Sequence, residues 1–189
     1  MRRIPDILTA EEQNALINAA NKRYYTGQRN RAILALMLAS GLRVGEVTRL
    51  KWNDMSLNTG KLHIKQGKRN KDRILWVGEE IVDQLRAWAD RQEADTDAWT
   101  GFMFTTRPGG QVSPRYIQAM VARLRQRCGL RKHITPHTLR HTFATDLLRQ
   151  TNNLRLVQKA LGHSSIKTTE IYTHIADEEL EAALKGFRR

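Results

Sequence analysis

Two short segments place an arginine where it could bind a phosphate group. In Gly-Leu-Arg-Val-Gly-Glu, Arg43 and Glu46 lie one helical turn apart, and in Pro-His-Thr-Leu-Arg-His, His137 and Arg140 have the same spacing. Guanidinium groups form paired, charge-assisted hydrogen bonds to phosphate oxygens. Both segments are therefore candidates for binding an anionic group, although each is ambiguous alone.

Each candidate taken alone also has an ordinary structural interpretation. Arg43 and Glu46 can form a surface ion pair that contributes little to stability. His141 is interpreted as a core histidine that satisfies a neighbouring backbone group, and His163 can be a solvated loop residue. An isolated tyrosine such as Tyr172 is more often a packing residue than a nucleophile. The functional interpretation therefore depends on the whole set.

Helical periodicity covers most of the chain, and the helix ends carry recognisable signals. A capping box begins at Thr9, glycine follows an apolar run at Ser40-Gly41, and Thr135-Pro136 is a typical helix start. Helices are predicted from Thr9 to about Lys22, over 32–39, around 81–89, over 154–161, and in the tail at 177–187. Three more are predicted to begin near Arg43, at Ser113 and at Thr135.

Three short segments have the composition of strands. Residues 61–65 alternate polar and apolar side chains, and residues 73–77 are rich in β-forming types. The polar segment 67–72 between them predicts a hairpin with a basic tip. A third strand is predicted at 102–105, before the turn signal Pro108-Gly109-Gly110. The fold class is mainly α with a small antiparallel β-sheet (α+β).

The charge balance indicates a polyanionic partner. The 189 residues include 32 Lys and Arg against 19 Asp and Glu, for a net charge of +13. Ribosomal or histone-like proteins share this sign, but they are usually shorter, tailed and poorer in long apolar helices, whereas 40% of this chain is hydrophobic. One cysteine, Cys128, and the lack of any apolar run of membrane-spanning length favour a cytoplasmic protein with no membrane partner.

Five segments together resemble a known family. They are Gly-Leu-Arg-Val-Gly-Glu at 41–46, Gly-Lys-Arg-Asn-Lys-Asp-Arg at 67–73, His-Thr-Leu-Arg at 137–140, Leu-Gly-His at 161–163, and Tyr172. In order and approximate spacing they resemble the active-site boxes of the tyrosine recombinases, the lambda-integrase and Xer family. Each box is weak alone, whereas five in register are specific. The resemblance covers the chain from Ile7 to the C-terminus.

The resemblance implies a set of catalytic roles around one phosphate. Arg43, Arg140 and His163 would hold its oxygens, and His137 would accept the phenolic proton of the nucleophile Tyr172. A neutral phenol, with a pKa of about 10, is a poor nucleophile without such help.

A hairpin lysine would supply the proton that the departing 5′ oxygen needs. Lys68 aligns best with that position, and Lys65 and Lys71 are close enough to be alternatives; all three could instead only contact phosphates. Glu46 would support Arg43 or His137 without touching DNA. The expected DNA contacts are Lys65, Arg69, Lys71, Arg73 and Arg115.

The implied activity is site-specific DNA recombination by strand cleavage and rejoining through a covalent 3′-phosphotyrosine. ATP is not expected, because the phosphotyrosine conserves the energy of the broken bond. A cofactor or metal is not expected either, because arginines take the place of a metal cation. The sequence also lacks Cys-x-x-Cys, His-Glu-x-x-His and phosphate-loop motifs. The alternatives are a short inversion-type recombinase, a topoisomerase IB-like nicking and resealing enzyme, and a non-catalytic DNA-binding regulator. The target site and the biological outcome are not encoded in these boxes.

One catalytic domain is expected over residues 1–189, without the N-terminal core-binding domain that most relatives carry. The chain is then either a fragment or a naturally short member, and we expect weak, salt-sensitive DNA binding. The apolar stripe of the tail 177–189 is expected to dock on a neighbouring copy, giving a monomer in solution and a tetramer on paired DNA sites. The alternative is that the tail folds back on its own domain.

Overall fold

The computed structural model describes residues 6–65 and 72–162. Its helices are α1 (Ala10–Asn18), α2 (Tyr25–Ser40), α3 (Val44–Arg49), α4 (Glu79–Asp95), α5 (Pro114–Arg127), α6 (Pro136–Thr151) and α7 (Leu154–Leu161), with a 3-10 turn at Trp52–Asp54. Its strands are β1 (Met55–Ser56), β2 (Lys61–Ile64) and β3 (Arg73–Trp76). The expected fold class, mainly α with a small antiparallel sheet, is confirmed.

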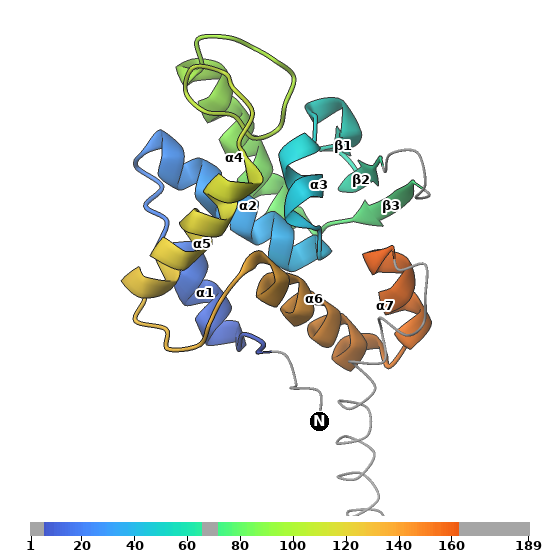
Figure 1. The fold of residues 1–189 in the computed structure, drawn as a ribbon. Coiled ribbons are helices and arrows are strands. Elements are labelled where there is room, and N and C mark those ends of the chain that lie inside the picture. The colour runs from blue at the N-terminus through green and yellow to red at the C-terminus, as the bar shows by residue number, and fades with distance from the viewer. Residues whose placement is uncertain (1–5, 66–71, 163–189) are drawn as a thin grey trace, which may run out of the picture.

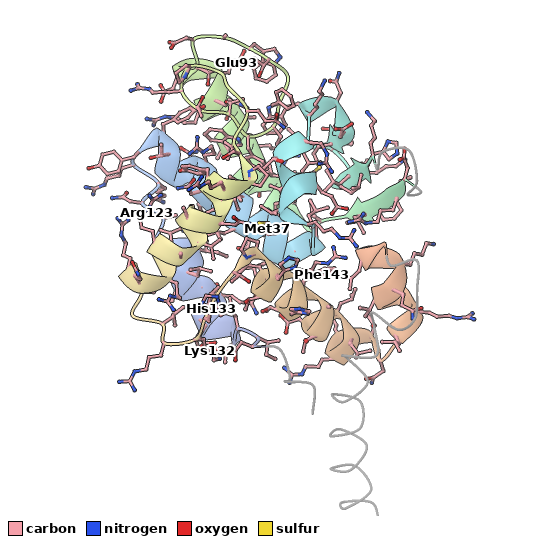
Figure 2. The ribbon with its side chains drawn as sticks, viewed as in Figure 1. Met37, Glu93, Arg123, Lys132, His133 and Phe143 are labelled. Atoms are coloured by element: carbon pink, nitrogen blue, oxygen red, sulfur yellow. The ribbon has the colours of Figure 1, made fainter. Side chains whose placement is uncertain are left out.

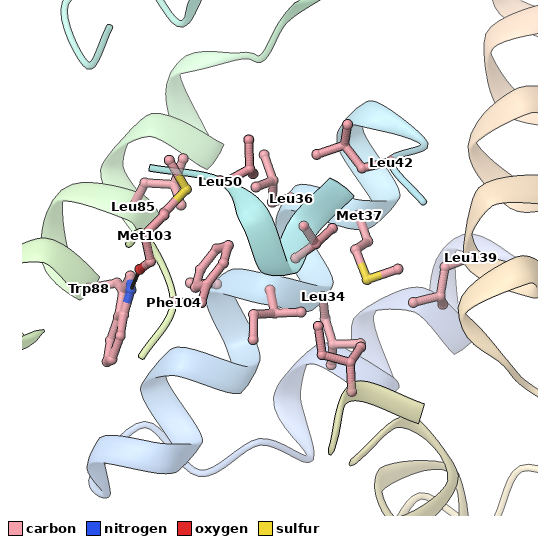
Figure 3. Packing of buried hydrophobic residues seen from close by; sticks show 14 of the residues in the cluster. Leu34, Leu36, Met37, Leu42, Leu50, Leu85, Trp88, Met103, Phe104 and Leu139 are labelled. Atoms are coloured by element: carbon pink, nitrogen blue, oxygen red, sulfur yellow. Dashed lines mark hydrogen bonds between the residues drawn. The ribbon is translucent and has the colours of Figure 1, made fainter. Parts of the chain in front are cut away.

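Helix α2 forms the centre of the core because its second half is apolar on every side. Leu34, Leu36 and Met37 are fully buried, and α4 and α6 pack along it (Figures 1 and 3). Figure 3 shows Trp88 and Phe104 approaching this helix region from one direction and Leu139 of α6 from the other. A helix that is apolar all round is stable only when neighbours cover it on all sides.

The helix ends follow the signals in the sequence, with one difference. Thr9 and Glu12 form the capping box of α1, and Gly41 and Gly162 take the left-handed conformation after α2 and α7. Helix α1, however, ends at Asn18, before the expected end near Lys22. The following residues turn instead, since the backbone of Tyr24 donates to the carbonyl of Asn21.

The sheet has the order β1-β2-β3 and is antiparallel throughout. The predicted hairpin of β2 and β3 is confirmed, with Ile64 opposite Arg73 at the end where the two strands are connected and Lys61 opposite Trp76 at the open end. The predicted strand at 102–105 is wrong, because this segment makes only isolated bridges, and β1 supplies the third strand.

Side chains explain why the segment 102–105 does not extend the sheet. Its main-chain carbonyls accept hydrogen bonds from the side chains of Gln92, Trp88 and Arg29. Met103 and Phe104 are buried in the core. The β-forming composition of this segment therefore reflects burial and not strand pairing.

The elements that carry the predicted boxes meet on one side of the molecule. Helix α7 lies beside β3, and α6 runs from the end of α2 toward α7 (Figure 1). Phe143 of α6 (Figure 2) packs directly over Gly41, where a side chain would meet its ring at 2.3 Å.

None of the helices in residues 6–65 and 72–162 has the length and the apolar character of a membrane span.

Candidate active site

Arg43 stands at the start of α3 and is tied to Glu46 one turn later. Its backbone amide donates to Glu46 Oε2 at 2.7 Å, and its Nη1 lies 3.4 Å from Glu46 Oε1. The Arg43 side chain is 40% exposed, whereas that of Glu46 is 4% exposed. In the first box, the Arg43 guanidinium is therefore partly exposed to solvent, while the carboxylate that it contacts is buried. The pair is not a surface ion pair, because Glu46 lies in the interior.

Glu46 has a second and closer partner in Arg73 of β3. Arg73 Nη1 and Nη2 donate to Glu46 Oε1 and Oε2, each at 2.9 Å, and both side chains are buried. Although Arg73 is among the expected DNA contacts, the structure places its guanidinium in the interior against this carboxylate. Two parallel hydrogen bonds of this kind fix both the distance and the orientation of the pair.

Burial alone would raise the pKa of Glu46. The hydrogen bonds from Arg73 and from the Arg43 amide, together with the charges of both arginines, outweigh that effect and leave the pKa below its ordinary value of 4.5. Glu46 is therefore ionised at neutral pH and acts as a fixed anion beneath Arg43.

Arg140 of α6 joins the ends of two other helices. Its Nη1 donates to the main-chain oxygen of Gly41 at 2.6 Å, and its Nη2 donates to that of Leu161 at 2.7 Å. These carbonyls belong to the C-terminal ends of α2 and α7, where helix carbonyls lack partners within the helix and favour a cation. Arg140 is 6% exposed, so its position is determined by the fold.

The contacts close into one ring. Arg73 Nε donates to the main-chain oxygen of Ala160 at 2.9 Å, and Ala160 precedes Leu161, whose oxygen Arg140 holds. Gly41, the other acceptor of Arg140, lies two residues before Arg43. The arginine ring, as we call Arg43, Glu46, Arg73, Arg140 and the carbonyls of 41, 160 and 161, thus connects α2, α3, β3, α6 and α7.

Two histidines lie near Arg140 on α6. His137 is exposed in the first turn of the helix, three residues before Arg140 and therefore on a nearby part of its surface. His141 is half-buried, and its pKa is lowered by burial and then by the charges of His137 and Arg140. His141 is therefore neutral at physiological pH.

The other described candidates lie outside the arginine ring. Lys65 Nζ contacts Asp54 Oδ1 at 2.5 Å, and this hydrogen bond and the charge of Asp54 raise the pKa of Lys65. Arg115 is exposed in the first turn of α5. In residues 6–65 and 72–162, no group of three or more His, Cys, Asp and Glu side chains is placed to hold a metal ion.

The remaining candidates lie outside the described residues, and their predicted roles stay predictions. They are the hairpin residues Lys68, Arg69 and Lys71, and His163 and Tyr172 after α7.

Reasoning from the sequence predicted Arg43 as a partner of Glu46 and missed Arg73, as well as the donors that hold the end of α7. The sequence prediction counts Arg73 among the DNA contacts, whereas the structure buries it. A signal for burial was nevertheless present, since strand alternation puts Arg73 on the same face as the buried Leu75. The carbonyls of Ala160 and Leu161 carry no such signal.

Comparison with known proteins identifies a family and several relatives of this chain. The model of the phage integrase family matches residues 6–179. Tyrosine recombinase XerC of Xanthomonas campestris pv. campestris is 40% identical over 179 residues, which are 95% of this chain and 54% of that protein. Tyrosine recombinase XerD of Staphylococcus saprophyticus subsp. saprophyticus is 34% identical over 188 residues, or 98% of this chain and 63% of that protein. The chain thus spans about half the length of the XerC relative.

Two solved structures show the same fold. The crystal structure of XerA recombinase superposes with a TM-score of 0.85 at 35% sequence identity. The match covers 100% of this chain and 67% of the XerA chain. A post-cleavage complex of the XerH site-specific recombinase with palindromic difH substrate gives a TM-score of 0.83 at 29% sequence identity. This match covers 99% of this chain and 54% of the XerH chain. The chain therefore belongs to the phage integrase family and has the catalytic-domain fold of the tyrosine recombinases.

Proposed function

We propose that this chain is the catalytic domain of a site-specific recombinase that cleaves and rejoins double-stranded DNA through a covalent 3′-phosphotyrosine at Tyr172. The observation that carries the proposal is the bond from Arg140 to the carbonyl of Gly41, which brings together two arginine boxes that lie 99 residues apart. XerH, a relative of the same fold, was crystallised on a recombination substrate in a post-cleavage complex.

The proposed reaction forms one bond and breaks one. The phenolic oxygen of Tyr172 attacks the scissile phosphorus, and His137 accepts the phenolic proton. The bond from phosphorus to the 5′ oxygen breaks, and Lys68 donates a proton to that oxygen. A 5′ hydroxyl from another strand reverses these steps and releases the tyrosine, so the phosphodiester is restored without ATP.

The arginine ring supplies the electrostatic part of this reaction. In the pentacovalent state the phosphate oxygens carry more negative charge than in the ground state, and fixed guanidinium donors stabilise that difference. Arg43 is partly exposed and is oriented by Glu46, while Arg140 is held by two carbonyls. We expect both cations to keep these positions when DNA binds, so that reorganisation costs little at the moment of reaction.

A nicked suicide substrate tests the chemistry directly. The protein is incubated with a duplex that carries its recombination site and a nick close to the scissile phosphate, so that the released short strand diffuses away and rejoining is blocked. Denaturing electrophoresis should show a protein band shifted by covalently bound DNA for the wild type and none for Tyr172→Phe. An unshifted wild-type band on its own site would refute covalent catalysis.

Matched assays separate recombination from the related nicking and resealing activity. Plasmids with two recombination sites should give recombinant products. Equal relaxation of supercoiled plasmids with and without these sites, and no recombinant product, would indicate the topoisomerase-like alternative.

We also propose that copies of the chain associate on DNA through the tail 177–189. A groove of about 570 Å³ between β3, α6 and α7 is lined mainly by apolar side chains, among them Ile74, Trp76, Leu147 and Leu156. Trp76 is 64% exposed, so this surface leaves a large aromatic group uncovered in the described chain. We assign it to the apolar stripe of the tail of a second copy; the lining holds one cation, Lys159, and one anion, Asp146, so apolar burial and not charge supports this assignment.

Substitution in the groove tests this association. Trp76→Glu should abolish coordinated strand exchange between two sites while a single site is still cleaved, and deletion of 177–189 should have the same effect. Cross-linked tetramers on paired sites should appear for the wild type, and a monomer should be found without DNA. Full recombination by Trp76→Glu would refute the groove as the docking surface.

A further inference from the structure

Arg73 uses its guanidinium for contacts within the protein. Of its five N–H donors, Nη1 and Nη2 bind the two oxygens of Glu46, and Nε binds the main-chain oxygen of Ala160, all at 2.9 Å. Its side chain is 7% exposed. An arginine in this state has little surface with which to reach DNA.

These bonds connect three elements that adjoin proposed catalytic residues in the sequence. Arg73 belongs to β3, Glu46 to α3 and Ala160 to the last turn of α7. Ala160 and Leu161 are successive residues, and their carbonyls are held by Arg73 and Arg140 respectively. Two guanidinium groups therefore cap the C-terminal end of α7, where a cation is favoured and unpaired carbonyls need donors.

We propose that Arg73 is a positioning residue that fixes the end of α7 and the Glu46 carboxylate relative to each other, and thereby sets the position of Arg43 relative to Arg140. Arg73 acts through Glu46 and Ala160 and does not contact DNA. The catalytic consequence rests on the proposed function, whereas the effect on α7 does not.

The geometry requires arginine and not only a positive charge. The planar guanidinium offers two parallel donors to a carboxylate and a third donor, Nε, in a different direction. A lysine ammonium carries all of its N–H donors on one nitrogen, so it cannot bind both Glu46 oxygens and the Ala160 carbonyl at the same time. Arg73→Lys should therefore keep the charge and lose the link to α7.

Hydrogen exchange tests the structural half of the inference without any activity. Backbone amides of 154–162 should exchange about tenfold faster in Arg73→Gln and Arg73→Lys than in the wild type, because the last turn of α7 opens more often. Arg86→Gln is the matched control, since Arg86 is an exposed arginine paired with the exposed Asp83. Unchanged exchange at α7 in both Arg73 variants would overturn the proposal.

DNA cleavage and DNA affinity test the catalytic half. The single-turnover rate of covalent complex formation should fall about 100-fold in Arg73→Gln, as expected when a catalytic group is displaced by about 1 Å. The slope of log Kd against log salt should stay unchanged, because no phosphate contact is lost. A slope reduced by about one, with a normal cleavage rate at saturating DNA, would show a phosphate contact instead and overturn the proposal.

A pH profile distinguishes positioning from a general loss of stability. The charged groups of the described chain that contact Glu46 are Arg43 on α3 and Arg73 on β3. Without Arg73, burial raises the pKa of Glu46, and the cleavage rate should acquire a new fall on the acid side. That fall should disappear in Arg73→Gln/Glu46→Gln, and its absence from the single variant would count against the coupling through Glu46.

The two proposals fail differently. If the wild type forms no covalent complex, the proposed function fails, while the exchange of 154–162 still decides whether Arg73 fixes α7. If the wild type cleaves and Arg73→Gln cleaves at the wild-type rate, the proposed function stands and the positioning role is wrong.

Discussion

Arg140 donates a hydrogen bond of 2.6 Å to the main-chain oxygen of Gly41, which lies 99 residues earlier in the chain. Because Gly41 is two residues before Arg43, this bond fixes the separation between two segments that each carry a guanidinium. The Arg140 side chain and the backbone at Gly41 therefore cannot separate without breaking a buried hydrogen bond, which costs about 1–3 kcal/mol.

Arg140→Lys should lower the rate of covalent complex formation by about 100-fold to 1000-fold, the usual effect of losing one transition-state donor. An ammonium keeps the charge but cannot span the carbonyls of Gly41 and Leu161. Single-turnover cleavage at saturating DNA measures the effect, and Arg86→Lys serves as the exposed control. A rate within about threefold of the wild type would contradict the assignment.

Gly41→Ala should destabilise the protein by more than the roughly 1–2 kcal/mol expected for a side chain in the left-handed region. Gly41 has φ +61, and a Cβ there would lie 2.3 Å from the Phe143 ring. Gly101→Ala is the matched control, since Gly101 has φ +75 and open space around its Cβ position. Chemical denaturation should show the excess for Gly41→Ala, and that excess should vanish in a Phe143→Ala background.

Glu46 should contribute stability that depends on pH. Its pKa in the folded protein lies below the ordinary value of 4.5, so its contribution is complete above that pH and is lost as pH falls through the folded-state pKa. The difference in Tm between the wild type and Glu46→Gln should therefore be largest above pH 4.5 and shrink below it. Other carboxylates, such as Glu12, are common to both proteins and cancel. A constant difference down to pH 2 would contradict this.

The choice between Lys65 and Lys68 as proton donor can be settled with a modified substrate. Lys65 is held by Asp54, which raises its pKa and occupies its ammonium at the end of β2. Lys68→Ala should slow cleavage by about 100-fold or more, and a 5′-bridging sulfur, whose thiolate leaves without a proton, should restore the rate. Lys65→Ala should show no such rescue. Rescue of Lys65→Ala alone would reverse the assignment.

Arg115→Ala should weaken DNA binding without changing sequence preference. Arg115 is exposed in the first turn of α5, where a guanidinium can reach a phosphate. Loss of one phosphate contact should reduce the slope of log Kd against log salt by about one. Binding titrations at several salt concentrations measure this, with Arg86→Ala as the control. A changed base preference would instead indicate a contact to a base edge.

The sequence by itself determined the features whose causes are local. Thr9 with Glu12, Thr135 with Pro136, and the glycines at 41 and 162 specify helix ends because capping and left-handed geometry involve residues at most a few positions apart. The hairpin followed from strand alternation, and the family followed from the order of the five boxes. The segment 102–105 shows the limit, since a buried loop and a strand share the same composition.

Only the tertiary structure decided which groups hold the arginines in place. Glu46 and Arg73 lie 27 residues apart, and Arg73 and Ala160 lie 87 residues apart. The acceptors at 41, 160 and 161 are main-chain carbonyls, which every residue possesses, so no residue type in the sequence marks them. Their selection depends on where α2 and α7 end in space, and that is set by packing of the core over the whole chain.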